Sequence, residues 1–345
     1  MTLERKRSIK IKVNNLKPGM KTARDIENDS NGIFIPAKTG LNKEHILRIK
    51  ELGYEFIYII LEKEEVFNGD IGKKEEIEKA YTENTDKVKN LFNKVKRAKT
   101  IEYNEIKGLV VEANKLSNQM DILDLVNMIR TVDEYTYTHS LNVSILANMF
   151  ARWLNFDDRE TISLTLAGLL HDIGKAEIPD KILNKPASLS PEEFEEMKKH
   201  TIYGYEMLKD VNEIPAAVKK AVITHHEHFS GEGYPLKLKS KKIPVFGRIL
   251  AIIDAFDAIT ANRVYKSKSS PVQAMEIFVN EETTHFDPAL KEVFLAHLPN
   301  YFIKENVILN DGRMGKIVFI NPRNPESPII QVSDQLIDLA KESQL

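Results

Sequence analysis

The residues best suited to chemistry are histidines and aspartates in the middle of the chain. The sequence has 9 histidines and no cysteine, and six of the histidines lie between positions 139 and 228. Imidazole and carboxylate ligands without thiolates suit iron, manganese, zinc or nickel. The candidate ligands are His139, His171, Asp172, His200, His225, His226 and Asp254.

Seven candidates are too many for one tetrahedral metal site, but they fit two metal ions that share a carboxylate. Asp172 has two oxygens and could bridge two cations about 3.5–4 Å apart. Two such cations would lower the pKa of a shared water and supply hydroxide for attack on a phosphodiester. Asp254 lies among apolar residues, where an unpaired charge is costly and a metal would account for it. These residues therefore predict metal-assisted hydrolysis.

Several of the same residue types also have an interpretation without a metal. A lone histidine more often caps a helix or hydrogen-bonds within a core. The histidines assigned to this class are His45, His228, His285 and His297. The adjacent pairs His171-Asp172 and His225-His226 are less easily explained in this way. Lys175 has two interpretations: a cation favoured by the dipole at a helix C-terminus, or a contact to a substrate phosphate near Asp172.

Helices are expected to position the candidate ligands. Apolar residues at helical spacing predict one helix that opens at His139 and another that closes at His171-Asp172. A third helix is expected to start at Pro215, which suits a first turn, and to end at His225-His226. Asp254 lies within a further, strongly apolar helix. Helix ends and inner faces would therefore bring the ligands together.

The chain as a whole predicts a mainly α protein with small flanking units. Alternating residues at 9–13 are typical of a half-buried strand, and a strand–turn–strand pattern surrounds Asn310-Asp311-Gly312. An amphipathic helix over 72–99 is indicated by Ile77, Tyr81, Val88, Leu91 and Val95. The expected domains are a small α+β N-terminal unit (1–70), a helical connector (71–125), a catalytic domain (126–300) and a C-terminal β element (301–345).

Composition limits the partners. With 42% hydrophobic and 29% charged residues and a net charge of −2, the chain indicates no attraction to a nucleic-acid polymer or a membrane. The first residues are charged and lack an apolar signal region, and no apolar run approaches the ~20 residues of a membrane span. We therefore expect a cytoplasmic protein. The connector could support a homodimer, although it has no sustained heptad pattern.

The ordered motifs of the central block resemble one known family. The run His171-Asp172-Ile173-Gly174-Lys175, followed by His225-His226-Glu227 and Gly233-Tyr234-Pro235, resembles the HD-GYP domain. This is the branch of the HD phosphohydrolase superfamily that typically degrades cyclic di-GMP. The resemblance covers roughly residues 126–298, from the segment around His139 through the segment around Asp254 to Phe286-Asp287-Pro288. It implies an HD-type helical bundle.

The resemblance also implies roles for individual residues. One metal ion would be held by His139, His171, Asp172 and Asp254, and the other by Asp172, His200, His225 and His226. Two divalent ions are expected, iron or manganese first, with zinc and nickel as alternatives. The catalytic residues would be Asp172 and Lys175, with Lys175 contacting the scissile phosphate. Arg263 and Lys266 would bind substrate phosphates, and Tyr234 would pack near a guanine.

The expected activity is hydrolysis of cyclic di-GMP to linear pGpG by a metal-bridged hydroxide, with further cleavage to GMP left open. GGDEF-domain proteins are expected signalling partners. Some family members bind a third metal through a glutamate at the position of Tyr135, so two metals are favoured here. The loop before Gly233 lacks the family's usual arginine and aspartate. A sensor that binds cyclic di-GMP without cutting it, and a phosphohydrolase for another nucleotide, are the alternatives.

Overall fold

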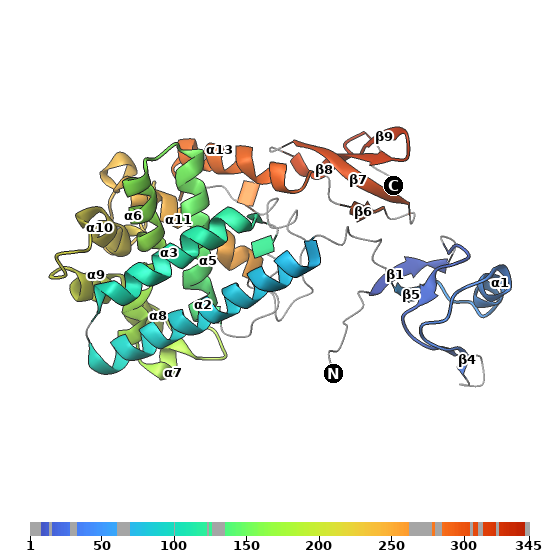
Figure 1. Cartoon of the computed structure of the whole chain (residues 1–345), viewed down its shortest axis with the longest axis horizontal. Coiled ribbons are helices and arrows are strands. Elements are labelled where there is room, and N and C mark those ends of the chain that lie inside the picture. Colours follow the sequence, from blue (N-terminus) through green and yellow to red (C-terminus); the bar gives the residue numbers. More distant parts are fainter. Residues whose placement is uncertain are drawn as a thin grey trace. The chain divides into compact units, whose positions relative to one another are not determined.

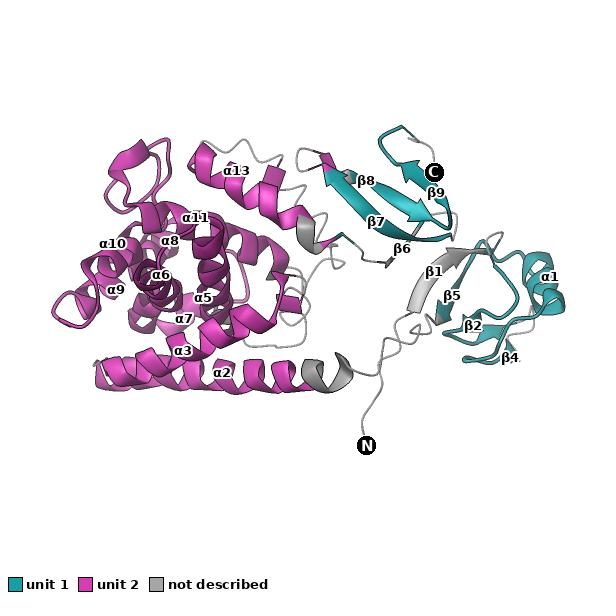
Figure 2. Cartoon of the chain, turned by 45° about the horizontal axis from the view of Figure 1, so that its top comes forward, with its two compact units in different colours: residues 1–71, 303–320, 327–345 teal, residues 72–302, 321–326 magenta. Residues whose placement is uncertain are grey.

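The computed structural model describes residues 8–13, 16–27, 33–60, 70–99, 101–122, 124–125, 135–261, 278–279, 285–303, 306–309, 313–321 and 324–341. The chain divides into two compact units (Figure 2): residues 1–71, 303–320 and 327–345 form one, and residues 72–302 and 321–326 form the other. Within the described ranges, no helix is long and apolar enough to cross a membrane.

The N-terminal part of the first unit is a small sheet with one helix. Strands β1 (Ser8–Lys12), β5 (Phe56–Ile60) and β2 (Lys21–Thr22) form an antiparallel sheet in the order β1-β5-β2, and β3 (Ile26–Glu27) pairs with β4 (Ile33–Ile35). Helix α1 (Lys43–Glu51) starts at a capping box between Asn42 and His45. The predicted capping role of His45 is therefore confirmed. Buried aliphatic residues on α1, β4 and β5 make this core.

The C-terminal part of the first unit is a four-stranded sheet. Its strands follow chain order: β6 (Asn306–Ile308), β7 (Met314–Asn321), β8 (Asn324–Val332) and β9 (Gln335–Asp338). Buried and more exposed residues alternate over the first half of β7, from Met314 to Ile317, as expected for a strand with one face on a core. The expected α+β N-terminal unit and short β C-terminal element are thus present.

The second unit is helical (Figure 1). Its elements are α2 (Asp70–Ala98), α3 (Tyr103–Gln119), α5 (Tyr135–Trp153), α6 (Asp158–Leu170), η2 (Ile173–Glu177), α7 (Asp180–Leu183), α8 (Pro191–Lys198), α9 (His200–Leu208), α10 (Ala216–Thr224), η3 (Ser240–Lys242), α11 (Val245–Ala261), α13 (Pro288–His297) and η4 (Leu298–Tyr301). Helix α5 packs against α3, α6 and α11, while α10 packs against α9 and α11. The predicted mainly α fold with a helical bundle is confirmed.

Helix α5 is the central element of this bundle. Residues 138–151 are all buried, and a helix that is buried all round lies inside a core. Several of its polar side chains are paired; for example, the Ser144 hydroxyl donates to the Thr165 carbonyl at 3.0 Å. The prediction that this helix opens at His139 is wrong, because α5 already includes Tyr135. The spacing of the apolar residues indicates the buried part of this helix, but it does not indicate where the first turn begins.

Candidate metal centre

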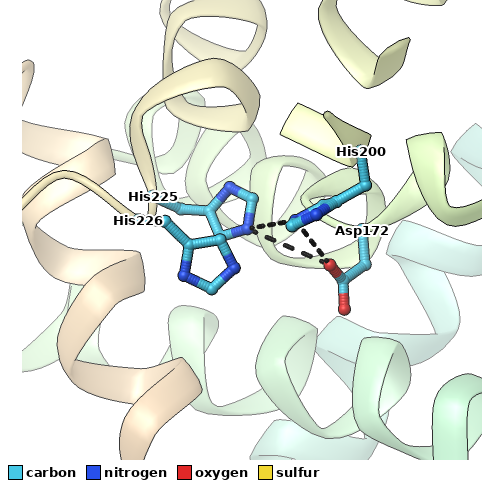
Figure 3. A group of neighbouring side chains, drawn as sticks. All are labelled: Asp172, His200, His225 and His226. Carbon is cyan, nitrogen blue, oxygen red and sulfur yellow. Dashed lines mark hydrogen bonds and ion pairs between the residues drawn. The ribbon is translucent and has the colours of Figure 1, made fainter. Parts of the chain in front are cut away.

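Helix ends and two inner helix faces bring all seven candidate ligands together. His171 caps the C-terminus of α6, Asp172 precedes η2, His200 begins α9, and His225 caps the C-terminus of α10. The side chains form two groups, each with ligand atoms within 4.8 Å of one another. We call them the His200 group (Asp172, His200, His225, His226), shown in Figure 3, and the His139 group (His139, His171, Asp254).

Asp172 lies between the two groups. Its Oδ1 is 3.3 Å from His200 Nε2 and 3.9 Å from His225 Nε2. Its Oδ2 is 3.3 Å from His171 Nε2 and 3.5 Å from His139 Nε2. Each oxygen of this carboxylate therefore faces a different group, which is the arrangement that a bridging ligand requires.

Three histidines are oriented by the same backbone device. The Nδ1–H groups of His171, His200 and His225 donate to the carbonyls three residues earlier, each at 2.8 Å. These carbonyls lie in the last turns of α6, α8 and α10, where helices lack a full set of internal partners. Because a carbonyl can only accept, each Nδ1 carries the proton, and the Nε2 lone pair points into the site.

This arrangement fits a bound cation. His200 Nε2 and His225 Nε2 are 3.3 Å apart, and both carry lone pairs, so they repel unless a positive charge lies between them. When two nitrogens bind the same metal ion, each at about 2.0–2.1 Å, the distance between the two nitrogens is comparable to this one. Asp172 Oδ1 is buried and has no hydrogen-bond partner among the described residues. The donor set therefore suits a metal ion better than a network of hydrogen bonds.

Burial keeps the His200 group in the protonation state that metal ligands need. Burial lowers the pKa of His200 to about 4 and that of His226 to about 3, and it holds the pKa of His225 well below 6.5. Burial alone would raise the pKa of Asp172, but the positive charge of Lys175 and the neighbouring histidines hold it well below its usual value. Neutral imidazoles thus face an ionised carboxylate.

The His139 group has a different charge balance. Burial lowers the pKa of His139, but hydrogen bonds to Asp254 and Asp257 outweigh it and raise the pKa to about 10. Asp254 Oδ1 is 3.1 Å from Nε2, and Asp257 Oδ2 is 2.7 Å from Nδ1. Asp257 thus orients the ring from behind, as carboxylates commonly do for metal-binding histidines.

The sequence-based prediction missed Asp257. This residue is fully buried on α11, three residues after Asp254 and on the same helix face. A second aspartate in so apolar a helix was a usable signal, because a buried carboxylate needs a partner. Nothing in the local sequence indicated that the partner is His139.

Lys175 and Tyr234 lie beside the ligand groups. Lys175 Nζ is 2.5 Å from Asp172 Oδ2 and partly exposed. The ring of Tyr234 stacks on the ring of His226, with centroids 4.8 Å apart. Arg263 and Lys266, the other two predicted substrate contacts, lie outside the described residues.

The loop that carries Tyr234 is closed by Glu227. The buried Glu227 carboxylate accepts hydrogen bonds from the backbone N–H groups of Leu236 and Leu238, at 2.6 and 2.9 Å. A side chain at Gly233 would lie 2.2 Å from the His228 nitrogen, so this close approach requires glycine. The arginine and aspartate that are usual in the family are missing from this loop. Its backbone is nevertheless held against His226, because the Tyr234 N–H donates to the His226 carbonyl.

Comparison with known proteins agrees with this geometry. A family model described as HD domain matches residues 117–290. The cyclic di-GMP phosphodiesterase PA4108 of Pseudomonas aeruginosa is 34% identical over 269 residues, which cover 74% of this chain and 64% of that protein. The 3'3'-cGAMP-specific phosphodiesterase 2 of Vibrio cholerae is 35% identical over 191 residues, 55% of this chain and 36% of that protein. The chain thus spans less than two thirds of these relatives.

A solved structure shows the same fold. Bd1817, an HDG"Y"P protein from Bdellovibrio bacteriovorus, aligns with a TM-score of 0.51 and 18% sequence identity, over 83% of this chain and 98% of that one. The HD-domain model matches half of the chain and includes all seven candidate ligands. The resemblance to the HD-GYP domain is confirmed, and the chain belongs to the HD domain family, whose members bind divalent metal ions.

Proposed function

We propose that this protein is a metal-dependent phosphodiesterase that hydrolyses cyclic di-GMP to linear pGpG. The observation that carries the proposal is Asp172, whose two oxygens face two separate groups of ligand atoms. The name of the Pseudomonas aeruginosa relative supports the substrate. Onward cleavage of pGpG to GMP is a second step that the same assay measures.

In this proposal the seven candidate side chains hold two divalent ions, with Asp172 shared between them. Mixed imidazole and carboxylate ligands suit iron and manganese, which we propose ahead of zinc and nickel. When bound, such ions would lower the pKa of a shared water and offset the charge that develops on the phosphate. The ionised Asp172 and Asp254 balance part of the metal charge, so the site keeps affinity for an anionic substrate.

The chain's own residues would bind and orient the substrate. Lys175 carries a partly exposed ammonium next to Asp172, so it can reach a phosphate oxygen at the centre of the site. Tyr234 is held by His226 on one side of its ring, and burial raises the pKa of its hydroxyl, which therefore remains a donor. We assign Tyr234 to the nucleobase, and Arg263 and Lys266 to the outer phosphates.

A second substrate is favoured by one comparison. The Vibrio cholerae relative named as 3'3'-cGAMP-specific is as similar in identity as the cyclic di-GMP phosphodiesterase. Both molecules are cyclic dinucleotides with two phosphodiester bonds, and they differ at one base. We therefore propose 3'3'-cGAMP as the competing substrate. The side chains around the base that differs would determine whether the protein binds it. GGDEF-domain partners and a homodimer remain predictions.

The test is a product assay on protein purified without oxygen and analysed for metal. Manganese-loaded or iron-loaded protein is incubated with cyclic di-GMP or 3'3'-cGAMP, and the products are separated by chromatography. Asp158→Ala, on the exposed first turn of α6, is the control for Asp172→Ala. We expect pGpG from the parent and from Asp158→Ala only. Tight binding of cyclic di-GMP by metal-loaded protein without any product would establish a sensor and overturn the proposal.

A further inference from the structure

A buried polar contact joins helix α2 to the central helix α5. Tyr81 of α2 is only 1% exposed, and its hydroxyl donates to Asn142 Oδ1 of α5 at 2.6 Å. Burying a phenol hydroxyl costs free energy unless it finds a partner, so this contact fixes both side chains. Helix α2 lies outside residues 117–290, the part that the HD-domain model matches.

The Asn142 side chain lies next to the groups that orient His139. Asn142 follows His139 by three residues in α5, so the two side chains share one helix face. On α11, Asp257 uses Oδ2 to pair with His139 Nδ1 at 2.7 Å. Burial raises the pKa of Tyr81, and the negative charge of Asp257 raises it further. Tyr81, Asn142 and Asp257 therefore belong to one buried cluster.

Two atoms of this cluster are complementary and unpaired. Asn142 Nδ2, a donor, and Asp257 Oδ1, an acceptor, are both buried and have no hydrogen-bond partner among the described residues. Buried polar groups are nearly always paired, directly or through a water. Tyr81 holds the other end of the Asn142 amide, so the amide N–H is turned away from Tyr81 and is free for the carboxylate.

We propose that Tyr81 is a positioning residue for His139. In this arrangement the phenol fixes Asn142, and the Asn142 amide holds the second oxygen of Asp257 through one buried water. Asp257 in turn keeps the Nδ1 proton on His139 and points Nε2 at the ligand group. The inference rests on the proposed metal site. It links helix α2, which precedes the residues that the HD-domain model matches, to His139, one of the candidate metal ligands.

The experiment compares metal binding by Tyr81→Phe and Tyr203→Phe. The Tyr203 hydroxyl donates to Glu196 at 3.1 Å near the surface, so this variant removes an equivalent group outside the cluster. Calorimetric titration of metal-free protein with Mn²⁺ gives the affinity of each binding step. We expect Tyr81→Phe to weaken one step about tenfold, the lower end for residues behind a metal ligand. Tyr203→Phe should change neither step.

A double-variant comparison separates positioning from a general structural role. Asp257→Asn should weaken the same step about 10- to 100-fold, and adding Tyr81→Phe should cost little more if Tyr81 acts through Asp257. Additive losses, or a Tyr81→Phe protein that melts earlier but binds Mn²⁺ as the parent does, would overturn the inference. A parent that does not bind two ions would overturn the proposed function itself, which is a distinguishable result.

Discussion

The His200 group and the His139 group present similar ligand atoms, but His139 is oriented by other means than His200 and His225. Backbone carbonyls at helix ends hold His200 and His225, and burial keeps both imidazoles neutral. In the His139 group, two carboxylates from α11 surround His139 and raise its pKa to about 10. The positions of His200 and His225 therefore depend on where helices end, as that of His171 also does, whereas the position of His139 depends on charged side chains between two packed helices.

The largest expected effect comes from the residue that the two groups share. Asp172→Ala removes a ligand from both groups, so we expect loss of both metal ions and a fall in turnover. Metal ions contribute several kcal/mol to such reactions, which corresponds to at least about 10³-fold in rate. Metal analysis and the product assay check this together. A variant that keeps one tightly bound ion would show that Asp172 serves a single group.

Lys175 should separate substrate binding from metal binding. Its ammonium touches Asp172 Oδ2 but offers no lone pair while charged, so Lys175→Met should leave two metal ions bound. Loss of one charged donor at a reacting phosphate lowers turnover by about 10²- to 10³-fold. Metal content and kcat are measured on the same preparation. A parallel loss of metal would place Lys175 in the structural support of Asp172 instead.

The two groups should respond differently to pH. His139 has a raised pKa of about 10, so at neutral pH its proton must leave before Nε2 can bind a metal. Affinity at the His139 group should therefore rise about tenfold per pH unit from pH 7 to 9, with about one proton released per ion. His200 and His226, with pKa values of about 4 and 3, release none in this range.

Calorimetric titration in buffers of different ionisation enthalpy counts the released protons. Equal proton release by the two binding steps would contradict the contrast between the groups, because it would mean that the carboxylates around His139 do not hold its proton.

The smallest expected effect tests the packing that places His200 relative to Asp172. A side chain at Gly174 would lie 2.0 Å from the His200 carbonyl oxygen and 2.4 Å from the Gly204 nitrogen. Gly174→Ala must therefore push η2 away from α9, and such overpacking costs about 1–3 kcal/mol. Gly108→Ala is the matched control, since nothing lies within 4 Å of its added carbon.

Thermal unfolding measures both glycine variants. Gly174→Ala should melt earlier than the parent and bind metal more weakly at the His200 group, whereas Gly108→Ala in the helix α3 should be neutral or slightly stabilised. A Gly174→Ala protein with unchanged stability would show that η2 and α9 can separate freely.

Much of the local structure could be predicted from sequence because its signals are local. The buried face of α2, with Ile77, Tyr81 and Val88, follows the predicted helical spacing, and β1 (Ser8–Lys12) covers most of the predicted strand at 9–13. The pairs His171-Asp172 and His225-His226 lie at helix ends as predicted. The structure brings the candidate ligands together, and their binding of metal remains a prediction.

The relations between distant segments could not be predicted in this way. No local sequence pattern indicates that Asp257 orients His139 or that Tyr81 reaches Asn142. Both contacts arise only when α2, α5 and α11 pack together. The start of α5 was misplaced because its first turn is not marked by apolar spacing. The division into four domains stays a prediction, as do the roles of Arg263 and Lys266.

One titration tests the central claim most directly. Metal-free protein is loaded stepwise with Mn²⁺ without oxygen, and pGpG formed from cyclic di-GMP is measured against the number of ions bound per chain. The shared Asp172 predicts that product formation is slight with one ion and rises as the second ion binds. Full activity with one ion per chain, or no product with two, would contradict a two-metal phosphodiesterase.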